Sequence, residues 1–165
     1  MVKGILFYDL DGTIIDSSHR AKYDNGILDL NHWKANCTKE NILADDLLPL
    51  YWELYQNWLD GYYICLNTAR EMGYWDYEYL RINHIPYHKI LSRPNGDNRA
   101  DWILKAKQQN KLLSLKWAKG KSVAFYDDKI ENLEGVQKYL EYHNKLIYTV
   151  NAKQLNEEWG VKYAY

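Results

Sequence analysis

Short apolar runs recur along the chain and alternate with segments of helical spacing. The runs cover residues 5–8, 62–66, 88–91, 123–126 and 146–150. Between them, apolar residues three and four positions apart occur in 47–59, 72–85, 97–113 and 129–143. Strands that alternate with helices predict an α/β fold, with a central parallel sheet flanked by helices and joined by right-handed crossovers. Residues that follow the strands then meet at one sheet edge, where such folds bind ligands.

The connection between the first two apolar runs is too long for a simple crossover. Residues 16–60 contain one segment with clear helical spacing and several aromatic side chains, namely Trp33, Tyr51, Trp52, Tyr55 and Trp58. We therefore expect residues 1–165 to form a single domain, with a small helical cap inserted at about 16–60. Residues after 151 predict a short helix with an aromatic end, formed by Trp159, Tyr163 and Tyr165, that packs on the body.

Composition and charge narrow the class of protein. The 165 residues carry 21 Lys and Arg against 22 Asp and Glu, which gives a net charge of −1. This balance argues against a long nucleic-acid groove or a membrane surface as the partner, and no apolar stretch approaches membrane-spanning length. Cys37 and Cys65 are isolated, so we expect no disulfide framework and a reducing, cytoplasmic location. No obligate protein partner is evident.

The first apolar run ends in two carboxylates, Asp9 and Asp11, followed by Gly12. Residues two apart in an extended chain point to the same side, and glycine allows the backbone to turn sharply. The pattern suits a divalent cation together with one nucleophilic or acid–base group. A strand that runs into an ordinary turn has the same sequence, so these two residues alone leave both interpretations open.

Three further groups follow the later runs. Thr68 ends the second run and can donate to a phosphate oxygen or cap a helix, and the fork of Arg70 suits bidentate phosphate binding. Lys105 lies four and eight residues after Asp101 and Asp97, which predicts that all three share one helical face. The fourth run ends in Asp127 and Asp128, a pair typical of metal coordination or of a capped helix start.

Taken in order, these motifs resemble those of the haloacid dehalogenase (HAD) superfamily of phosphohydrolases. Within it, residues 4 to about 150 resemble the 3′-phosphatase domain of phage polynucleotide kinase–phosphatases and related stand-alone phage nucleotide phosphatases. The matching positions are Arg20 after the first motif, Thr68-Ala69-Arg70, and a third motif with Arg93, Gly96, Asp97, Arg99, Asp101 and Lys105. A Walker-type loop is missing, so no kinase activity is expected.

The resemblance implies a Rossmann-like HAD fold and a Mg²⁺-dependent phosphomonoesterase. Asp9 would attack phosphorus and form a phosphoaspartate. Asp11 would protonate the leaving group and then activate water, which requires a raised pKa that its carboxylate neighbours would favour.

The remaining implied roles concern the metal and the phosphate. Mg²⁺ would be held by Asp9, the backbone carbonyl of Asp11, Asp127 and Asp128, because hard oxygen ligands favour it. Thr68 and Lys105 would hold the phosphate. The implied substrate-binding residues are Arg20, Arg70, Arg93 and Asp101.

Two substrates fit this chemistry. One is a free (deoxy)nucleoside 5′-monophosphate whose base stacks on a cap aromatic, and the other is the 3′-phosphorylated end of a polynucleotide. The near-neutral charge favours the mononucleotide, because a polynucleotide groove needs several excess cations. A catalytically idle HAD fold used for binding is a third hypothesis, against which the complete set of motif residues argues.

Overall fold

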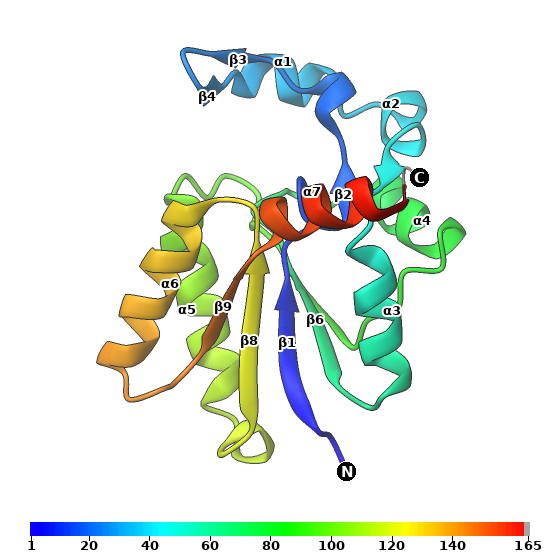
Figure 1. Ribbon diagram of the computed structural model, residues 1–165. Helices are drawn as coiled ribbons and strands as arrows, with labels where there is room; N and C mark the ends of the chain where they lie inside the picture. The colour runs from blue at the N-terminus through cyan, green and yellow to red at the C-terminus, as the bar shows by residue number, and fades with distance from the viewer. Residues whose placement is uncertain (164–165) are drawn as a thin grey trace.

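The computed structural model describes residues 1–163 and contains a five-stranded parallel sheet (Figure 1). Each apolar run in the sequence forms one of its strands. In spatial order these are β7 (Lys89–Leu91), β6 (Tyr63–Asn67), β1 (Gly4–Tyr8), β8 (Ser122–Asp127) and β9 (Tyr148–Asn151). The predicted parallel α/β sheet is therefore confirmed, and its most buried strand, β1, is the one that precedes Asp9.

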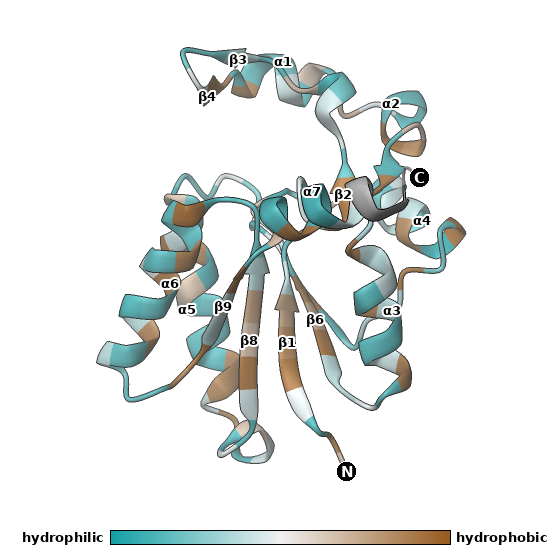
Figure 2. Ribbon diagram, in the orientation of Figure 1, coloured by the Kyte–Doolittle hydropathy of each residue, from teal (hydrophilic) through white to brown (hydrophobic). Residues whose placement is uncertain are grey.

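Helices cover both faces of the sheet, and alternate residues of β1 supply both cores. Ile5 and Phe7 pack with α5 (Asp101–Leu113) and α6 (Ile130–Tyr142). Leu6 and Tyr8 pack with α3 (Tyr51–Leu59) and α4 (Tyr74–Ile82). This alternation follows from the two-residue period of a strand. Figure 2 shows apolar residues along the central strands and hydrophilic ones on the outer side of α6.

The insertion after β1 projects beyond the carboxyl edge of the sheet (Figure 1). Two short strands form its root, where β2 (Ile15–Asp16) pairs antiparallel with β5 (Asp46–Leu47). Beyond the root come a 3-10 turn, a small hairpin and two short helices: η1 (Ser18–Arg20), β3 (Tyr23–Asp24), β4 (Ile27–Leu28), α1 (Leu30–Ala35) and α2 (Lys39–Leu43).

The helix expected within this cap belongs instead to the body. Leu50 and Leu54 of the α3 region are fully buried in the same core as Leu6 and Ile64, so α3 packs on the sheet beside β6. The segment that stands over the sheet edge therefore ends near Leu47 rather than near residue 60. The expectation of one clear cap helix missed α1 and α2, which are too short to show a helical period.

The start of α5 also differs from the sequence-based expectation. The helix begins at Asp101, and Asp97 lies in the preceding turn, where its carboxylate accepts a hydrogen bond from the backbone N–H of Arg99 at 3.0 Å. An aspartate that closes its own turn in this way competes with helix formation. The prediction that Asp97 shares a helical face with Lys105 is therefore wrong, whereas Asp101 and Lys105 do lie on α5.

The chain continues after β9 into α7 (Ala152–Tyr163), as the sequence predicts. Ala152 is fully buried and Trp159 is partly buried, whereas Tyr165 lies outside the described residues. Within residues 1–163, no helix is both long enough and apolar enough to cross a membrane.

Candidate active site

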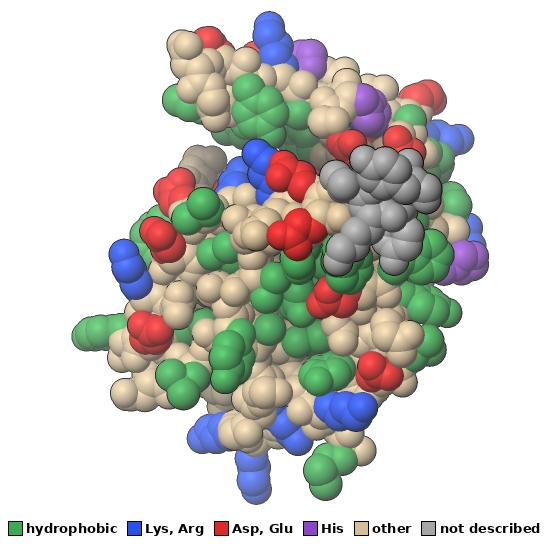
Figure 3. All heavy atoms as spheres, viewed as in Figure 1, with side chains coloured by type: hydrophobic (Ala, Val, Ile, Leu, Met, Phe, Trp, Pro, Cys, Tyr) green, Lys and Arg blue, Asp and Glu red, His purple; other side chains and the backbone are tan. Residues whose placement is uncertain are grey.

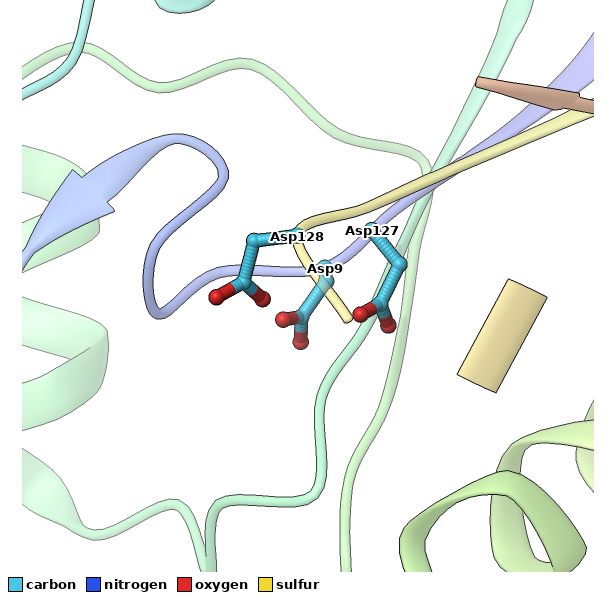
Figure 4. A group of neighbouring side chains, drawn as sticks. All are labelled: Asp9, Asp127 and Asp128. Carbon is cyan, nitrogen blue, oxygen red and sulfur yellow. The ribbon is translucent and has the colours of Figure 1, made fainter. Parts of the chain in front are cut away.

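The carboxyl ends of β1 and β8 bring three acidic side chains together. The two strands are parallel neighbours with Tyr8 paired to Tyr126, so Asp9 and Asp127 leave the sheet side by side. Asp9, Asp127 and Asp128 each offer a carboxylate oxygen within 4.8 Å of the others. Figure 4 shows the three carboxylates next to one another with their oxygens on the same side. The structure thus brings these three predicted metal ligands to one place.

Lys105 supplies a positive charge to this cluster. Its Nζ lies 2.8 Å from Asp9 Oδ1 and 2.6 Å from Asp127 Oδ2. The side chain is only 1% exposed, and burial alone would lower its pKa, but the two carboxylates raise the pKa above its ordinary value. Lys105 therefore stays charged and binds two of the three acids, at the position that the sequence predicts.

The carboxylates still outnumber the buried ammonium. Burial raises the pKa of Asp9 well above its usual value, Lys105 opposes the rise, and the neighbouring carboxylates add to it. Burial and the charge of Asp127 raise the pKa of Asp128 to about 6. Asp128 Oδ1 is also buried without a hydrogen-bond partner among the described residues. Excess negative charge and an unpaired carboxylate oxygen fit a divalent cation bound by hard oxygen ligands, such as Mg²⁺.

Asp127 is held by contacts that the sequence did not reveal. The side chain of Asn132 donates to both of its oxygens at 3.1 Å, and the backbone N–H of Lys129 donates to Oδ1 at 2.9 Å. Both donors come from the start of α6. The signal for Asn132 is its position in the first turn of the helix that follows the acidic pair.

Asp11 has a different environment from the other acids. It accepts hydrogen bonds from Arg70 Nε at 3.1 Å, from Arg70 Nη2, and from Ser17 Oγ at 2.6 Å. Burial opposes its ionisation, but the charge and hydrogen bonds of Arg70, helped by Ser17, outweigh burial and lower its pKa. The expectation of a raised pKa is wrong for this arrangement, because the nearest partner of Asp11 is a guanidinium rather than another carboxylate.

Arg20 and Arg70 are both buried beneath the cap and paired with acidic side chains. Arg20 binds both oxygens of Asp45 at 2.9 Å, and Trp33 lies 4.2 Å from its guanidinium carbon. Arg70, besides binding Asp11, donates to Asp76 at 2.6 Å and lies 3.6 Å from Asp45. Their donors are therefore engaged by carboxylates in this structure. No pattern in the sequence identifies Asp45 or Asp76 as their partners.

Arg93 and Asp101 shape the loop that precedes α5. Arg93 donates to the backbone carbonyls of Ala69, Asp97 and Arg99 at 2.8–2.9 Å and to Asp101 at 2.7 Å. Asp101 also lies 3.4 Å from the ammonium of Lys129. The structure thus places these two predicted substrate-binding residues together, with the Arg93 donors directed to the protein itself.

Thr68 lies at the end of β6 and is 1% exposed. Its Oγ1 accepts a hydrogen bond from the backbone N–H of Arg70 at 3.0 Å, which closes the turn after the strand. It does not cap α4, whose N-cap is Gly73. The Thr68 hydroxyl proton has no acceptor among the side chains and backbone groups that the structure describes, so it can donate to a ligand.

A buried amide network, absent from our sequence-based prediction, fixes α5 against this strand end. Asn67 donates to Gln108 and accepts from Gln109, each at 2.9 Å. Asn67 and Gln109 are fully buried, so the network sets the position of the helix that carries Lys105. A buried amide directly before Thr68 is the one local signal that identifies it.

The sequence of this chain is similar to that of a known protein family. The family model described as bacteriophage T5 5′-deoxynucleotidase matches residues 1–99. The 5′-deoxynucleotidase of Escherichia phage T5 is 41% identical over 85 residues, which are 48% of this chain and 35% of that protein. This chain therefore matches about a third of the length of that relative.

Solved structures support the fold. A Pnkp1/Rnl/Hen1 RNA repair complex matches 90% of this chain and 42% of its own, with 23% identity and a TM-score of 0.61. A haloacid dehalogenase-like hydrolase from Streptococcus pneumoniae matches 94% of this chain and 98% of its own, with 13% identity and a TM-score of 0.58. The HAD domain of the Legionella pneumophila effector Lem4 matches 91% of this chain and 86% of its own, with 16% identity and a TM-score of 0.58. The predicted HAD-like fold is confirmed, and the chain belongs to the bacteriophage T5 5′-deoxynucleotidase family.

Proposed function

We propose that this protein is a Mg²⁺-dependent phosphomonoesterase that hydrolyses deoxynucleoside 5′-monophosphates. The observation that carries the proposal is the cluster of Asp9, Asp127 and Asp128 around buried Lys105, at the sheet edge where such folds bind ligands. Membership of a family described as 5′-deoxynucleotidase favours the 5′-mononucleotide as substrate. The likeness to the RNA repair complex is a likeness of fold and does not favour a polynucleotide.

Asp9 is the nucleophile in this proposal. One of its oxygens pairs with Lys105, which leaves the other to attack phosphorus as the bond from phosphorus to O5′ breaks. The product is a phosphoaspartate and a deoxynucleoside alkoxide, which must gain a proton. Water then attacks the phosphorus of the phosphoaspartate, which releases inorganic phosphate and regenerates the Asp9 carboxylate. Lys105 keeps its proton throughout and lowers the repulsion between Asp9 and the phosphate.

Asp11 is the general acid and base. It gives a proton to the leaving alkoxide and later accepts one from the attacking water. While it is bound to Arg70, Asp11 is ionised, so it must first leave Arg70 and take up one proton from solvent, which it then gives to the alkoxide and regains from the attacking water. A phosphate dianion is a suitable competitor for the guanidinium, because Arg forms bidentate pairs with phosphate as well as with carboxylate.

Asp9, Asp127 and Asp128 would hold Mg²⁺, with the unpaired Oδ1 of Asp128 as one available ligand atom. When bound, the ion would neutralise carboxylate and phosphate charge so that the two anions can approach each other. The Thr68 hydroxyl, which has no acceptor among the described residues, would donate its proton to a phosphate oxygen.

A phosphate-release panel with Mg²⁺ tests the substrate class. It compares the deoxynucleoside 5′-monophosphates, their 3′-monophosphate isomers and a 3′-phosphorylated oligonucleotide. We expect release from the 5′-monophosphates. Release from the oligonucleotide alone would replace the proposal with polynucleotide 3′-phosphatase activity, and no release from any phosphomonoester would indicate a binding module. The same panel is run with Asp9→Asn, which removes the proposed nucleophile. Asp60→Asn, at an exposed position remote from the acidic cluster, is its matched control.

A further inference from the structure

A single buried amide joins the C-terminal helix to both ends of the cap insertion. The side chain of Asn156 on α7 donates to the carbonyl of Thr13 at 2.9 Å and accepts from the backbone N–H of Leu50 at 2.8 Å. Asn156 is 9% exposed, so water competes little for these groups. Figure 1 shows α7 running across the carboxyl edge of the sheet beside β2.

The two backbone groups that Asn156 binds lie where the insertion leaves the body and returns to it. Thr13 precedes β2, and Leu50 directly precedes α3. Between these points β2 pairs with β5, and the N–H of Leu48 donates to the carbonyl of Ile14 at 2.8 Å. Asn156 therefore closes the base of the two-stranded root from which the cap projects.

Thr13 also belongs to the loop that carries Asp11. The carbonyl of Leu10 accepts from the N–H groups of Thr13, Ile14 and Ile15 at 2.9–3.1 Å, so the loop is one compact turn. On one side Gly12 lies against the Asp128 carboxylate, so closely that a Cβ there would overlap Oδ2. Asn156 holds the same loop through Thr13. The turn is thus fixed between the acidic cluster and α7.

Helix α7 is itself anchored to the body. Ala152 is fully buried in the core that contains Leu10, Leu50 and Tyr126, and α7 also contacts β8. Asn156 therefore connects the root of the cap to a helix that is itself packed on the sheet. The family model ends at residue 99, so α7 lies outside the matched region.

We propose that Asn156 is a positioning residue for the phosphatase reaction. It fixes the loop of Asp11 and the root of the cap together, so that both keep one position relative to Asp9. This inference rests on the proposed function, because it assigns Asn156 a role in presenting the general acid and the cap to a nucleotide.

Two phosphomonoesters separate positioning from simple stabilisation. A deoxynucleoside 5′-monophosphate has a leaving group that needs a proton, and it is large enough to reach the cap. For p-nitrophenyl phosphate, the nitrophenolate leaves without a proton. We expect Asn156→Ala to lower kcat/KM for the nucleotide by about 10- to 100-fold, and for p-nitrophenyl phosphate by less than about 3-fold. Glu157→Gln, an exposed neighbour on α7, should leave both values unchanged.

Asn156→Asp tests the two halves of the contact separately. It keeps an acceptor for the N–H of Leu50 and loses the donor to Thr13, so the selective loss on the nucleotide should persist. Amide hydrogen exchange reports the contact directly. The Leu50 amide should exchange about 10-fold faster or more in Asn156→Ala, while Asn156→Asp should retain most of its protection.

Each outcome decides between the alternatives. Equal losses on both substrates, in parallel with a lower Tm, would overturn the proposal and leave Asn156 a purely structural residue. Unchanged Leu50 exchange in Asn156→Ala would overturn the contact itself. If the wild-type protein hydrolyses p-nitrophenyl phosphate but no nucleotide, the proposed function fails, and hydrogen exchange alone then decides whether Asn156 fixes the root.

Discussion

Asp11 and Asp9 are two residues apart but experience opposite electrostatic environments. Asp9 shares Lys105 with Asp127, and burial, helped by the neighbouring carboxylates, raises its pKa. Asp11 is bound to Arg70 and Ser17, and Arg70 lowers its pKa despite burial. Pairs of acids whose surroundings separate their pKa values commonly divide the chemical roles of a site. Without a bound cation these directions are opposite to those that a nucleophile at Asp9 and a proton carrier at Asp11 need, so the proposed roles require a cation to favour the Asp9 carboxylate and the release of Asp11 from Arg70.

The role of Asp11 predicts a substrate-dependent defect. Asp11→Asn should lower kcat/KM for a deoxynucleoside 5′-monophosphate by about 10²- to 10⁴-fold, because general acid–base catalysis contributes on that scale. Turnover of p-nitrophenyl phosphate should fall far less, since its leaving group needs no proton. Asp60→Asn is the control. Steady-state kinetics on both substrates make the comparison, and an equal loss on both would exclude Asp11 as the general acid.

The raised pKa of Asp128 predicts how the metal-free protein responds to pH. Its value of about 6 in the folded state lies above the usual value for an unfolded chain, about 3.9. The stability that this carboxyl contributes is therefore fully present below about pH 4 and is lost as pH rises through 6. In EDTA at pH 8, the free energy of unfolding of Asp128→Asn should exceed that of the wild type by on the order of 2 kcal/mol, as measured by chemical denaturation.

The same experiment at pH 4 provides the internal control, because the carboxyl is then protonated in the folded state and about half protonated in the unfolded state, so most of the difference should disappear. Adding Mg²⁺ at pH 8 should stabilise the wild type more than Asp128→Asn. A wild type that is the more stable protein in EDTA at pH 8 would contradict the excess negative charge inferred for the cluster.

At the scale of elements, hydrophobic periodicity predicted the five strands and the helices α3 to α6, although not all of their boundaries. Strand β1 buries every residue, and α6 places Leu133, Val136 and Leu140 on one face, so both patterns are strong. The helices α1 and α2 have six and five residues, and neither shows a helical period. The start of α5 was missed because the Asp97 carboxylate closes a turn that resembles a helix start in the sequence.

Local sequence patterns also determine which site residues could be predicted. Asp9, Lys105 and Asp127 follow strands or lie on a strongly periodic helix, so topology alone brings them together. Asp45 and Asn156 instead act through contacts that span 25 to 143 residues of chain, with no local pattern to reveal them. Partners of this kind become visible only once the chain is folded.

Gly12 links the first-motif turn to the acidic cluster. Its φ is +75°, and a Cβ would overlap Asp128 Oδ2. Gly61 has a similar φ of +87° but no atom within 4 Å of an added Cβ, so it is a matched control. Both alanine variants should lose about 1–2 kcal/mol of stability from backbone strain. Only Gly12→Ala should also lose phosphatase activity, by about 10-fold or more, because Asp128 must move.

Denaturation and phosphate release on the two glycine variants make this comparison. Equal activity in the two variants would mean that the close contact between Gly12 and Asp128 has no part in organising the site.

At the scale of the whole molecule, the cap is a thin lobe with little core of its own. Its hairpin and first helix leave Tyr23, Ile27 and Leu30 between 59% and 74% exposed. Figure 3 shows a hollow between this lobe and the body. The cap is held mainly at its base, where Asp45 binds Arg20 and the Tyr79 hydroxyl donates to the Asp45 carbonyl at 3.0 Å. Helix α2 adds a second attachment, because Ile42 is buried in the core and α2 packs on α4.

This arrangement predicts that the base of the cap depends on Asp45. Asp45→Asn leaves the fully buried Arg20 without its charge partner and should destabilise the protein by about 3 kcal/mol, as expected for half of a broken buried ion pair. The exposed neighbour Asp46→Asn should change stability by less than about 0.5 kcal/mol. Chemical denaturation of both variants tests this, and equal stability would contradict the pairing.

The central claim is that Asp9 performs metal-dependent phosphoryl transfer from a nucleotide. The most direct test is phosphate release from deoxynucleoside 5′-monophosphates by the wild type and by Asp9→Asn, each with Mg²⁺ and with EDTA. We predict phosphate release by the wild type with Mg²⁺ and its loss in EDTA. The rate for Asp9→Asn should be lower than the wild-type rate by about a thousandfold or more. Wild-type rates in Asp9→Asn, or equal rates with Mg²⁺ and EDTA, would contradict the claim.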